Sequence, residues 1–362
     1  MTKAVALVRA PATPSPARAV APVRSAWIVS PRVDLACVVL SPVLALLLVV
    51  VLLGLVESFG SAASLERTRV RLGFFTAVWT GAHLVAVFFR SHADPEVFAR
   101  HRIRFVVVPP LLYLALVSSA WVTTTALVVT ALWDVWHTAM QSFGLGRLYD
   151  ARAGNSAEEG RGLDLAVNVA VYVAPILAGL SLVPTLAWFE LYSALGWEGP
   201  ARFLVGVGEF AGPIRAAAIG GGGAVVVVWM VRLRARMRRG YRPARAKLLL
   251  LASTAVASIV AWGFLPPLEA FVTANLWHAL QYFVIVWATE RDRIGRVLGP
   301  GRFGLPRAAT LVAYGLFLAV AGLLYVGVAE SALRACLAAA LVCSILHFWY
   351  DGFVWSVRRR HV

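Results

Sequence analysis

Residues 131–150 read ALWDVWHTAMQSFGLGRLYD, an apolar segment that carries three strongly polar side chains in the register D-x-x-H-x-x-x-Q. At 3.6 residues per turn, Asp134, His137 and Gln141 lie on one face of a helix. An unpaired polar group in hydrocarbon costs several kcal/mol. The segment therefore predicts a helix whose polar face has partners inside the protein.

Three further apolar segments contain polar residues in a similar arrangement. They are Asn275, His278 and Gln281 in ANLWHALQYFVIVW, His347 and Asp351 in ILHFWYDGFVW, and His83 in AVWTGAHLVAVFF. We expect the four histidines of these segments to meet in one place.

The composition of the chain is that of a membrane protein. Of its 362 residues, 60% are hydrophobic and 14% are charged, whereas about a quarter of the residues of a soluble domain are charged. Several apolar runs reach the ~20 residues needed to cross a bilayer. We expect an all-α, polytopic helical bundle in the inner (plasma) membrane, with one transmembrane domain at 33–357 and a disordered basic cytoplasmic tail at 1–32.

Hydropathy predicts ten membrane spans with both termini in the cytoplasm. The spans lie at about 33–56, 72–89, 105–120, 123–146, 163–184, 214–231, 248–266, 270–289, 308–328 and 333–356. A more polar segment at 186–212 is predicted to lie in the membrane interface.

The distribution of basic residues agrees with this topology. Only six of the 34 lysines and arginines fall on the outer side: Arg67, Arg69, Arg71, Arg202, Arg215 and Arg334. Such asymmetry is the positive-inside rule, and it explains the net charge of +16 without a nucleic-acid partner. The sequence contains no nucleic-acid-binding motif.

The histidines occupy spans two, four, eight and ten, which all run from the outside to the cytoplasm. The first arginine after each histidine follows within 7 to 13 residues, so the imidazoles are predicted at similar depths. Spans two to four and spans eight to ten share one plan, a histidine helix, a spacer helix and a second histidine helix.

Ionisable residues inside a membrane usually mark a functional site, and imidazole is a ligand for iron, copper and zinc. The predicted metal ligands are His83, His137, His278 and His347. Asp134 and Asp351 are predicted to orient ligands or relay protons. Gln141, Asn275 and Gln281 are predicted either to hold the second imidazole nitrogens or to add ligands. Interhelical hydrogen bonding is the alternative role for the two glutamines and for any single histidine.

Aromatic residues beside the histidines predict an apolar wall for a lipophilic substrate. These residues are Trp136, Trp277, Phe348 and Trp349. Trp355, nearer the predicted end of its span, is typical of an interfacial aromatic belt.

The fragment His347, Phe348 and Asp351, set among intramembrane histidines, resembles the membrane-embedded histidine-cluster iron enzymes of the bacterial retinal-forming β-carotene oxygenase type. That resemblance implies an all-helical membrane enzyme with non-haem iron. The H-x-x-x-H and H-x-x-H-H boxes of the membrane fatty-acid desaturases do not occur in this sequence.

Three functions fit these patterns. The first is a metal-dependent, iron-containing oxidoreductase or oxygenase that acts on a lipid or isoprenoid and takes electrons from an unidentified donor. The second is a haem-binding membrane electron carrier with histidines as axial ligands, and the third is a proton or metal-ion transporter. The sequence does not favour a soluble-type hydrolase, because neither G-x-S-x-G nor H-E-x-x-H occurs.

Overall fold

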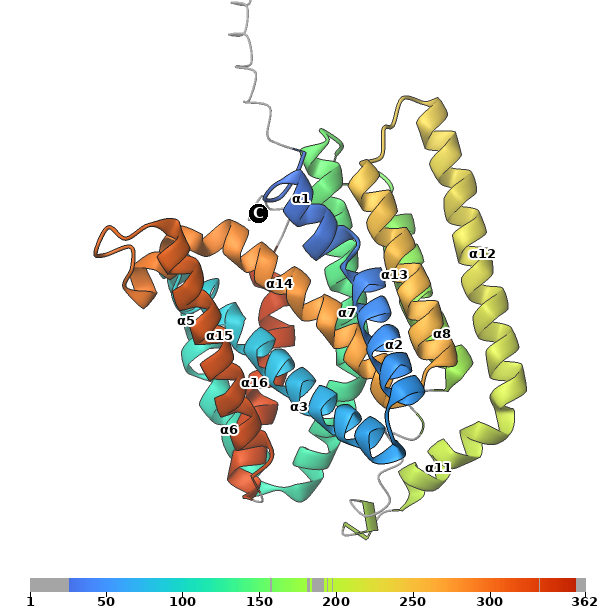
Figure 1. The fold of residues 1–362 in the computed structure, drawn as a ribbon, viewed down its shortest axis with the longest axis horizontal. Helices are drawn as coiled ribbons and strands as arrows, with labels where there is room; N and C mark the ends of the chain where they lie inside the picture. The colour runs from blue at the N-terminus through green and yellow to red at the C-terminus, as the bar shows by residue number, and fades with distance from the viewer. Residues whose placement is uncertain are drawn as a thin grey trace, which may run out of the picture.

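The structure is a computed structural model that describes residues 26–156, 158–180, 183, 192–193, 195–196, 198–331 and 333–355. Over these residues the chain is helical and contains no β-strand, which confirms the predicted all-α class (Figure 1). Residues 1–25 of the predicted tail at 1–32 lie outside the described residues. The basic residues 358–360 and most of 184–197 also lie outside them.

The helices follow one another with short connections. The first half contains α1 (Pro31–Asp34), η1 (Leu35–Val39, a π-helix), α2 (Ser41–Phe59), α3 (Ala62–Ala86), η2 (Val87–Phe89, 3₁₀), α4 (Pro95–Arg100), α5 (Arg102–Val106), α6 (Val108–Ser118) and α7 (Ala120–Arg152). The second half contains α8 (Arg161–Gly179), α11 (Gly199–Val207), η3 (Gly208–Phe210, 3₁₀), α12 (Ala211–Arg238), α13 (Arg245–Phe264), α14 (Pro267–Leu298), α15 (Arg307–Ala329) and α16 (Arg334–Val354).

Eight helices in the described part of the chain are long and apolar enough to cross a membrane, and nine spans result if the bent pair α5–α6 and α7 counts as one. Large apolar side chains cover their outer faces, and Leu48, Leu316 and Leu324 are 59%, 62% and 65% exposed. Extended apolar surface of this kind suits contact with lipid rather than water. The helix lengths and these surfaces indicate a membrane protein.

The predicted count of ten spans is corrected at the third and fourth. The third, 105–120, is divided at Val107 into α5 and α6, because Pro109 and Pro110 cannot continue a helix that enters from the amino-terminal side. With 11 residues, α6 is about 16 Å long, which is too short for a hydrocarbon core of ~30 Å. A bend of 118° separates it from α7 at Ser119.

The predicted interfacial segment 186–212 is described only in its second part. There α11 and η3 lead into α12, and α11 bends away from the axis of α12 (Figure 1). A single stretch, Ala201–Arg238, is apolar and long enough to span, so the chain enters this span earlier than the predicted residue 214.

In each of the two predicted sets, the spacer helix packs against a histidine helix of the other set. The spacer α15 lies against the histidine helix α3, and the spacer α6 lies against the histidine helix α16. Glycines permit the close approach of α3 and α15, because a Cβ on Gly322 would lie 2.9 Å from the Val78 side chain and one on Gly81 would lie 2.7 Å from Tyr325. This packing ties the two sets into one bundle around the histidines.

Candidate metal centre

Four helices each contribute one buried histidine to a single cluster: His83 from α3, His137 from α7, His278 from α14 and His347 from α16. The His83 ring centroid lies 4.3 Å from that of His347, 4.6 Å from that of His278 and 6.0 Å from that of His137. The His137 centroid lies 5.0 Å from those of both His278 and His347. The prediction that the four imidazoles meet in one place is confirmed.

Most ring nitrogens in this cluster have no hydrogen-bond partner among the described residues. Both nitrogens of His83 and His278, and Nε2 of His137 and His347, are buried and unpaired. Buried polar atoms are almost always satisfied in folded proteins, because an unsatisfied one costs about 1–3 kcal/mol. A group of adjacent unpaired nitrogens of this kind could share one ligand.

The donor geometry fits a metal ion. Nitrogens of His83, His137 and His278 lie within 4.8 Å of one another, and so do donor atoms of His137, His347 and Asp351. Two ligands ~2.1 Å from one ion lie at most ~4.2 Å apart, so ring rotations that move the donors by about half an ångström bring them into range. The two groups share His137, and each of them could hold a metal ion.

His347 has the orientation expected of a metal ligand. Its Nδ1 lies 3.1 Å from the main-chain oxygen of Leu84, and a carbonyl oxygen can only accept a hydrogen bond. The imidazole therefore donates from Nδ1, which leaves the lone pair of Nε2 directed into the cluster. Second hydrogen bonds of this kind fix the tautomer and ring position of metal-binding histidines.

Asp351 joins the cluster from α16, as predicted. Its Oδ2 lies 3.6 Å from Nε2 of His347 and 3.9 Å from Nε2 of His137. Its Oδ1 accepts hydrogen bonds from the hydroxyl of Tyr282 at 2.8 Å and from Nε1 of Trp355 at 3.1 Å. The carboxylate is thus held by one oxygen and faces the imidazoles with the other.

Asp134 does not reach the imidazoles. It is half-buried one turn before His137 on α7, it belongs to neither donor group, and no hydrogen bond or ion pair places it against the described residues. Its predicted catalytic role stays a prediction without geometric support.

The two predicted glutamines join helices instead of holding imidazole nitrogens. Nε2 of Gln141 donates to the main-chain oxygen of His278 at 2.8 Å and to Oε1 of Gln281 at 3.1 Å. Nε2 of Gln281 in turn donates to the main-chain oxygen of Val38 at 2.8 Å. These bonds connect α7, α14 and η1, which is the alternative role predicted for the glutamines from the sequence. Oε1 of Gln141 has no partner among the described residues, and Gln141 lines the cavity described below.

Asn275 has a similar structural place. Its Oδ1 accepts a hydrogen bond from the Thr80 hydroxyl at 3.0 Å, and its amide donates to the main-chain oxygen of Phe271 at 3.0 Å. The side chain therefore joins α14 to α3, and no hydrogen bond connects it to a histidine ring in the described part of the chain.

Tyr282 is a site residue that the sequence prediction missed. Its ring centroid lies 4.5 Å from that of His83 and 5.0 Å from that of His347, and its hydroxyl binds Asp351. It follows His278 by four residues and so shares its helix face, a spacing that could have identified it. Trp355, predicted as a belt residue, also binds Asp351 and lines the cavity.

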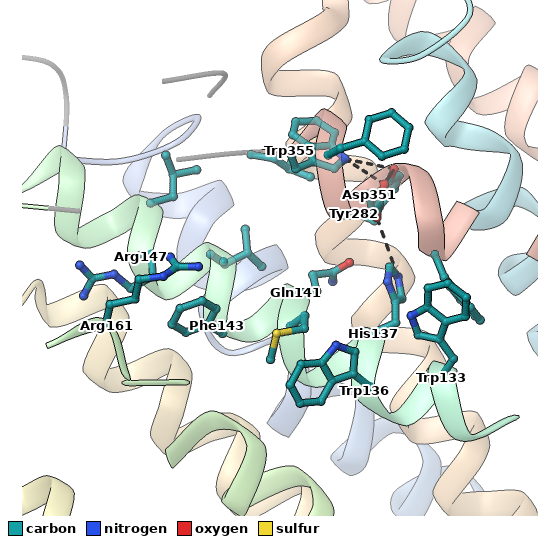
Figure 2. Close-up of a pocket in the computed structure, with 18 residues that line it drawn as sticks. Trp133, Trp136, His137, Gln141, Phe143, Arg147, Arg161, Tyr282, Asp351 and Trp355 are labelled. Carbon is teal, nitrogen blue, oxygen red and sulfur yellow. Dashed lines mark hydrogen bonds and ion pairs between the residues drawn. The ribbon is translucent and has the colours of Figure 1, made fainter. Parts of the chain in front are cut away.

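A cavity of about 580 Å³ opens beside the cluster and reaches His137 and Asp351 (Figure 2). Trp133, Trp136 and Phe348 form part of its wall, as the sequence predicts for two of them. The predicted wall residue Trp277 is fully buried and packs against Tyr172 instead, with ring centroids 6.4 Å apart.

The remaining predicted wall residue, Trp349, packs on Tyr350 and Phe353 on α16.

Comparison of the chain with protein-family models, curated proteins and solved structures finds no match. The functional argument therefore depends on the site itself.

Proposed function

We propose that this protein is an integral-membrane, iron-dependent oxidoreductase that acts on a lipid or isoprenoid. One observation carries the proposal: a cluster of four buried imidazoles with unpaired nitrogens reaches, through His137, a largely aromatic cavity of about 580 Å³. Imidazole suits iron, copper and zinc, and pockets of ~300–1,000 Å³ typically bind small organic ligands. Iron is chosen on the resemblance stated above, and the inner membrane is the proposed location.

The histidines are the proposed ligands, and Asp351 lies beside them. Non-haem iron held by imidazole and carboxylate supplies one-electron and dioxygen chemistry when it is bound. The protein must hold the proposed ligand His347 and the neighbouring Asp351 in fixed positions around the metal site. Leu84 sets the tautomer of His347, and Tyr282 and Trp355 hold the Asp351 carboxylate.

Asp351 is also the proposed proton-handling group. Asp351 lines the cavity, its Oδ2 lies 3.6 Å from Nε2 of His347, and the Tyr282 hydroxyl lies 2.8 Å from its Oδ1. In a hydroxylation, one atom of dioxygen enters a C–H bond and the other leaves as water, which requires two electrons and two protons from a donor. A carboxylate hydrogen-bonded to a phenol can receive and pass on such protons.

The arrangement favours a metal ion over the haem alternative. The His83 ring is in direct contact with those of His278 and His347, with centroid separations of 4.6 Å and 4.3 Å. A macrocycle between axial histidines would have to separate rings that pack against one another. The aromatic walls of the cavity likewise favour a lipophilic substrate over an ion path.

The test compares total lipid extracts by mass spectrometry. Cells expressing the wild type, His278→Ala or the exposed control His92→Ala are compared for lipids that have gained an oxygen atom or lost two hydrogens. We expect the same altered species with the wild type and His92→Ala, and none with His278→Ala. Identical lipid profiles for all three strains, with iron bound to the wild type, would contradict the proposed function.

A further inference from the structure

The cavity has two chemically different ends. His137 and Asp351 lie at one end, and Arg147 and Arg161 lie at the other, as Figure 2 shows. Aromatic and aliphatic side chains line the space between them, including Trp136. A neutral hydrocarbon would use only the wall, so the arginine end calls for a separate explanation.

The cavity follows α7. Its wall contains residues spaced three or four apart on that helix: Trp133, Trp136, Met140 and Gly144. Residues at this spacing form one stripe along a helix. Ten residues separate His137 from Arg147, which places the two ends about 15 Å apart along the helix axis. An extended chain can therefore lie along α7 with its ends in the two different environments.

The two arginines differ in their partners. Nη1 of Arg147 lies 2.6 Å from Asp164 and 3.2 Å from Asp150, so its charge is neutralised inside the protein. The guanidinium of Arg161 stands over the Phe143 ring, 5.1 Å from its centroid, and no carboxylate pairs with it among the described residues. Arg161 is only partly buried, so its donors remain available to an anion.

The backbone around Arg161 is also suited to an anion. Arg161 is the first residue of α8, and the preceding Gly160 supplies no side-chain cap. The first turn of a helix has the positive end of the helix dipole, and here the N–H of Arg161 itself donates to the main-chain oxygen of Glu158 at 3.3 Å, so the dipole rather than that N–H is the backbone contribution. This electrostatic contribution adds to that of the unpaired guanidinium at the same end of the cavity.

We propose that the cavity binds a single-chain amphiphile with an anionic head group, a carboxylate or a phosphate, on Arg161. The chain lies along the α7 stripe and its apolar part reaches the histidine cluster. This inference rests on the proposed function and specifies its substrate class. Guanidinium groups bind carboxylate and phosphate through paired, charge-assisted hydrogen bonds.

The test measures binding of radiolabelled oleate to the iron-loaded, detergent-purified full-length protein by scintillation proximity. Unlabelled oleyl alcohol and oleyl phosphate serve as competitors that keep the chain and change the head group. We expect oleate to bind at least about tenfold more tightly than the alcohol. Arg161→Gln should abolish that preference, Arg161→Lys should retain part of it, and the exposed control Arg238→Gln should leave it unchanged.

The competitor arms assign the head group. Stronger competition by oleyl phosphate than by unlabelled oleate assigns a phosphate, and the reverse assigns a carboxylate. Equal affinity of oleate and oleyl alcohol for the wild type would overturn the inference, and so would an equal loss of both in Arg161→Gln. Bound iron and altered lipids without head-group preference would refute this inference alone, whereas head-group preference without bound iron would refute the proposed function alone.

Discussion

Two buried polar clusters lie along α7, and they are satisfied in opposite ways. The histidine cluster near the middle of the helix has unpaired ring nitrogens. The charged cluster at its carboxyl end, defined as Arg147, Asp150, Asp164, Tyr241 and Lys247, is densely paired. The same helix thus presents one set of polar groups that lacks a partner and another that is internally neutralised.

The contacts of the charged cluster join three helices. Nζ of Lys247 on α13 lies 2.7 Å from Asp150 on α7 and 2.5 Å from Asp164 on α8, while Arg147 binds both carboxylates. The Tyr241 hydroxyl donates to Asp150. Burial and that neighbouring carboxylate raise the pKa of Tyr241 above its ordinary value, so it remains a hydrogen-bond donor at neutral pH.

The difference separates groups that hold helices together from groups that could bind a ligand. A buried charge that is fully paired contributes to the position of helices, and removing one member is costly. Buried nitrogens without partners beside a cavity could bind a ligand. Burial and polarity alone do not identify a site, and the partners of each polar atom decide the question.

The largest effect is expected from breaking the charged cluster. Lys247→Met leaves Asp150 and Asp164 with fewer cations, and loss of one member of a buried pair costs about 3–5 kcal/mol. Unfolding of the detergent-purified protein, followed by circular dichroism, should show a large loss of stability. The exposed Arg238→Met is the control, and an equal stability for Lys247→Met and wild type would show that the cluster holds nothing together.

Metal binding should stabilise the protein through the other cluster. Iron(II) at a hundred times its dissociation constant adds about 2.7 kcal/mol, because it binds only the folded arrangement of imidazoles. The unfolding midpoint should rise with iron and fall again with a chelator. The double variant His137→Ala/His278→Ala should show no such rise, and a rise equal to that of the wild type would place the metal elsewhere.

A smaller effect is expected at Asp351. Asp351→Asn keeps the size of the side chain and the hydrogen bonds of Oδ1 while it removes the negative charge beside His347 and His137. Loss of a supporting group typically lowers metal affinity about 10–100-fold. Competitive titration against a fluorescent chelator measures the change, and unaltered affinity would remove Asp351 from the centre.

The smallest effect is expected at Gln141. Gln141→Met removes hydrogen bonds between α7 and α14, and interhelical hydrogen bonds in membranes average about 0.6 kcal/mol. The iron content should stay at the wild-type level, because the amide contacts the main chain of His278 rather than its ring. A loss of iron from this variant would make Gln141 part of the site after all.

The convergence of the histidines was predictable because each lies in an apolar segment, where a polar side chain must turn inward. The partners within each segment were less predictable. Asp134, His137 and Gln141 share a helix face by their spacing, yet only His137 reaches the cluster, while Gln141 bonds to the main chain of α14. The helical period fixes the face, but the neighbouring helices decide which part of that face meets the cluster.

Two other features were beyond the reach of the sequence. The bend at Ser119 interrupts an apolar stretch without a glycine or proline at that point, so hydropathy shows two adjoining spans and no sharp turn. The charged cluster unites residues as distant as Arg147 and Lys247. In the sequence, these basic residues were indistinguishable from the topology signals that surround them.

Metal analysis of the purified protein tests the central claim most directly. Elemental analysis combined with X-ray absorption should find close to one iron per chain in the wild type and in His92→Ala, with nitrogen ligands at ~2.0–2.2 Å. The double variant His137→Ala/His278→Ala should fold and carry none. Equal metal content in the wild type and the folded double variant, or a metal-free wild type from iron-replete cells, would contradict the account.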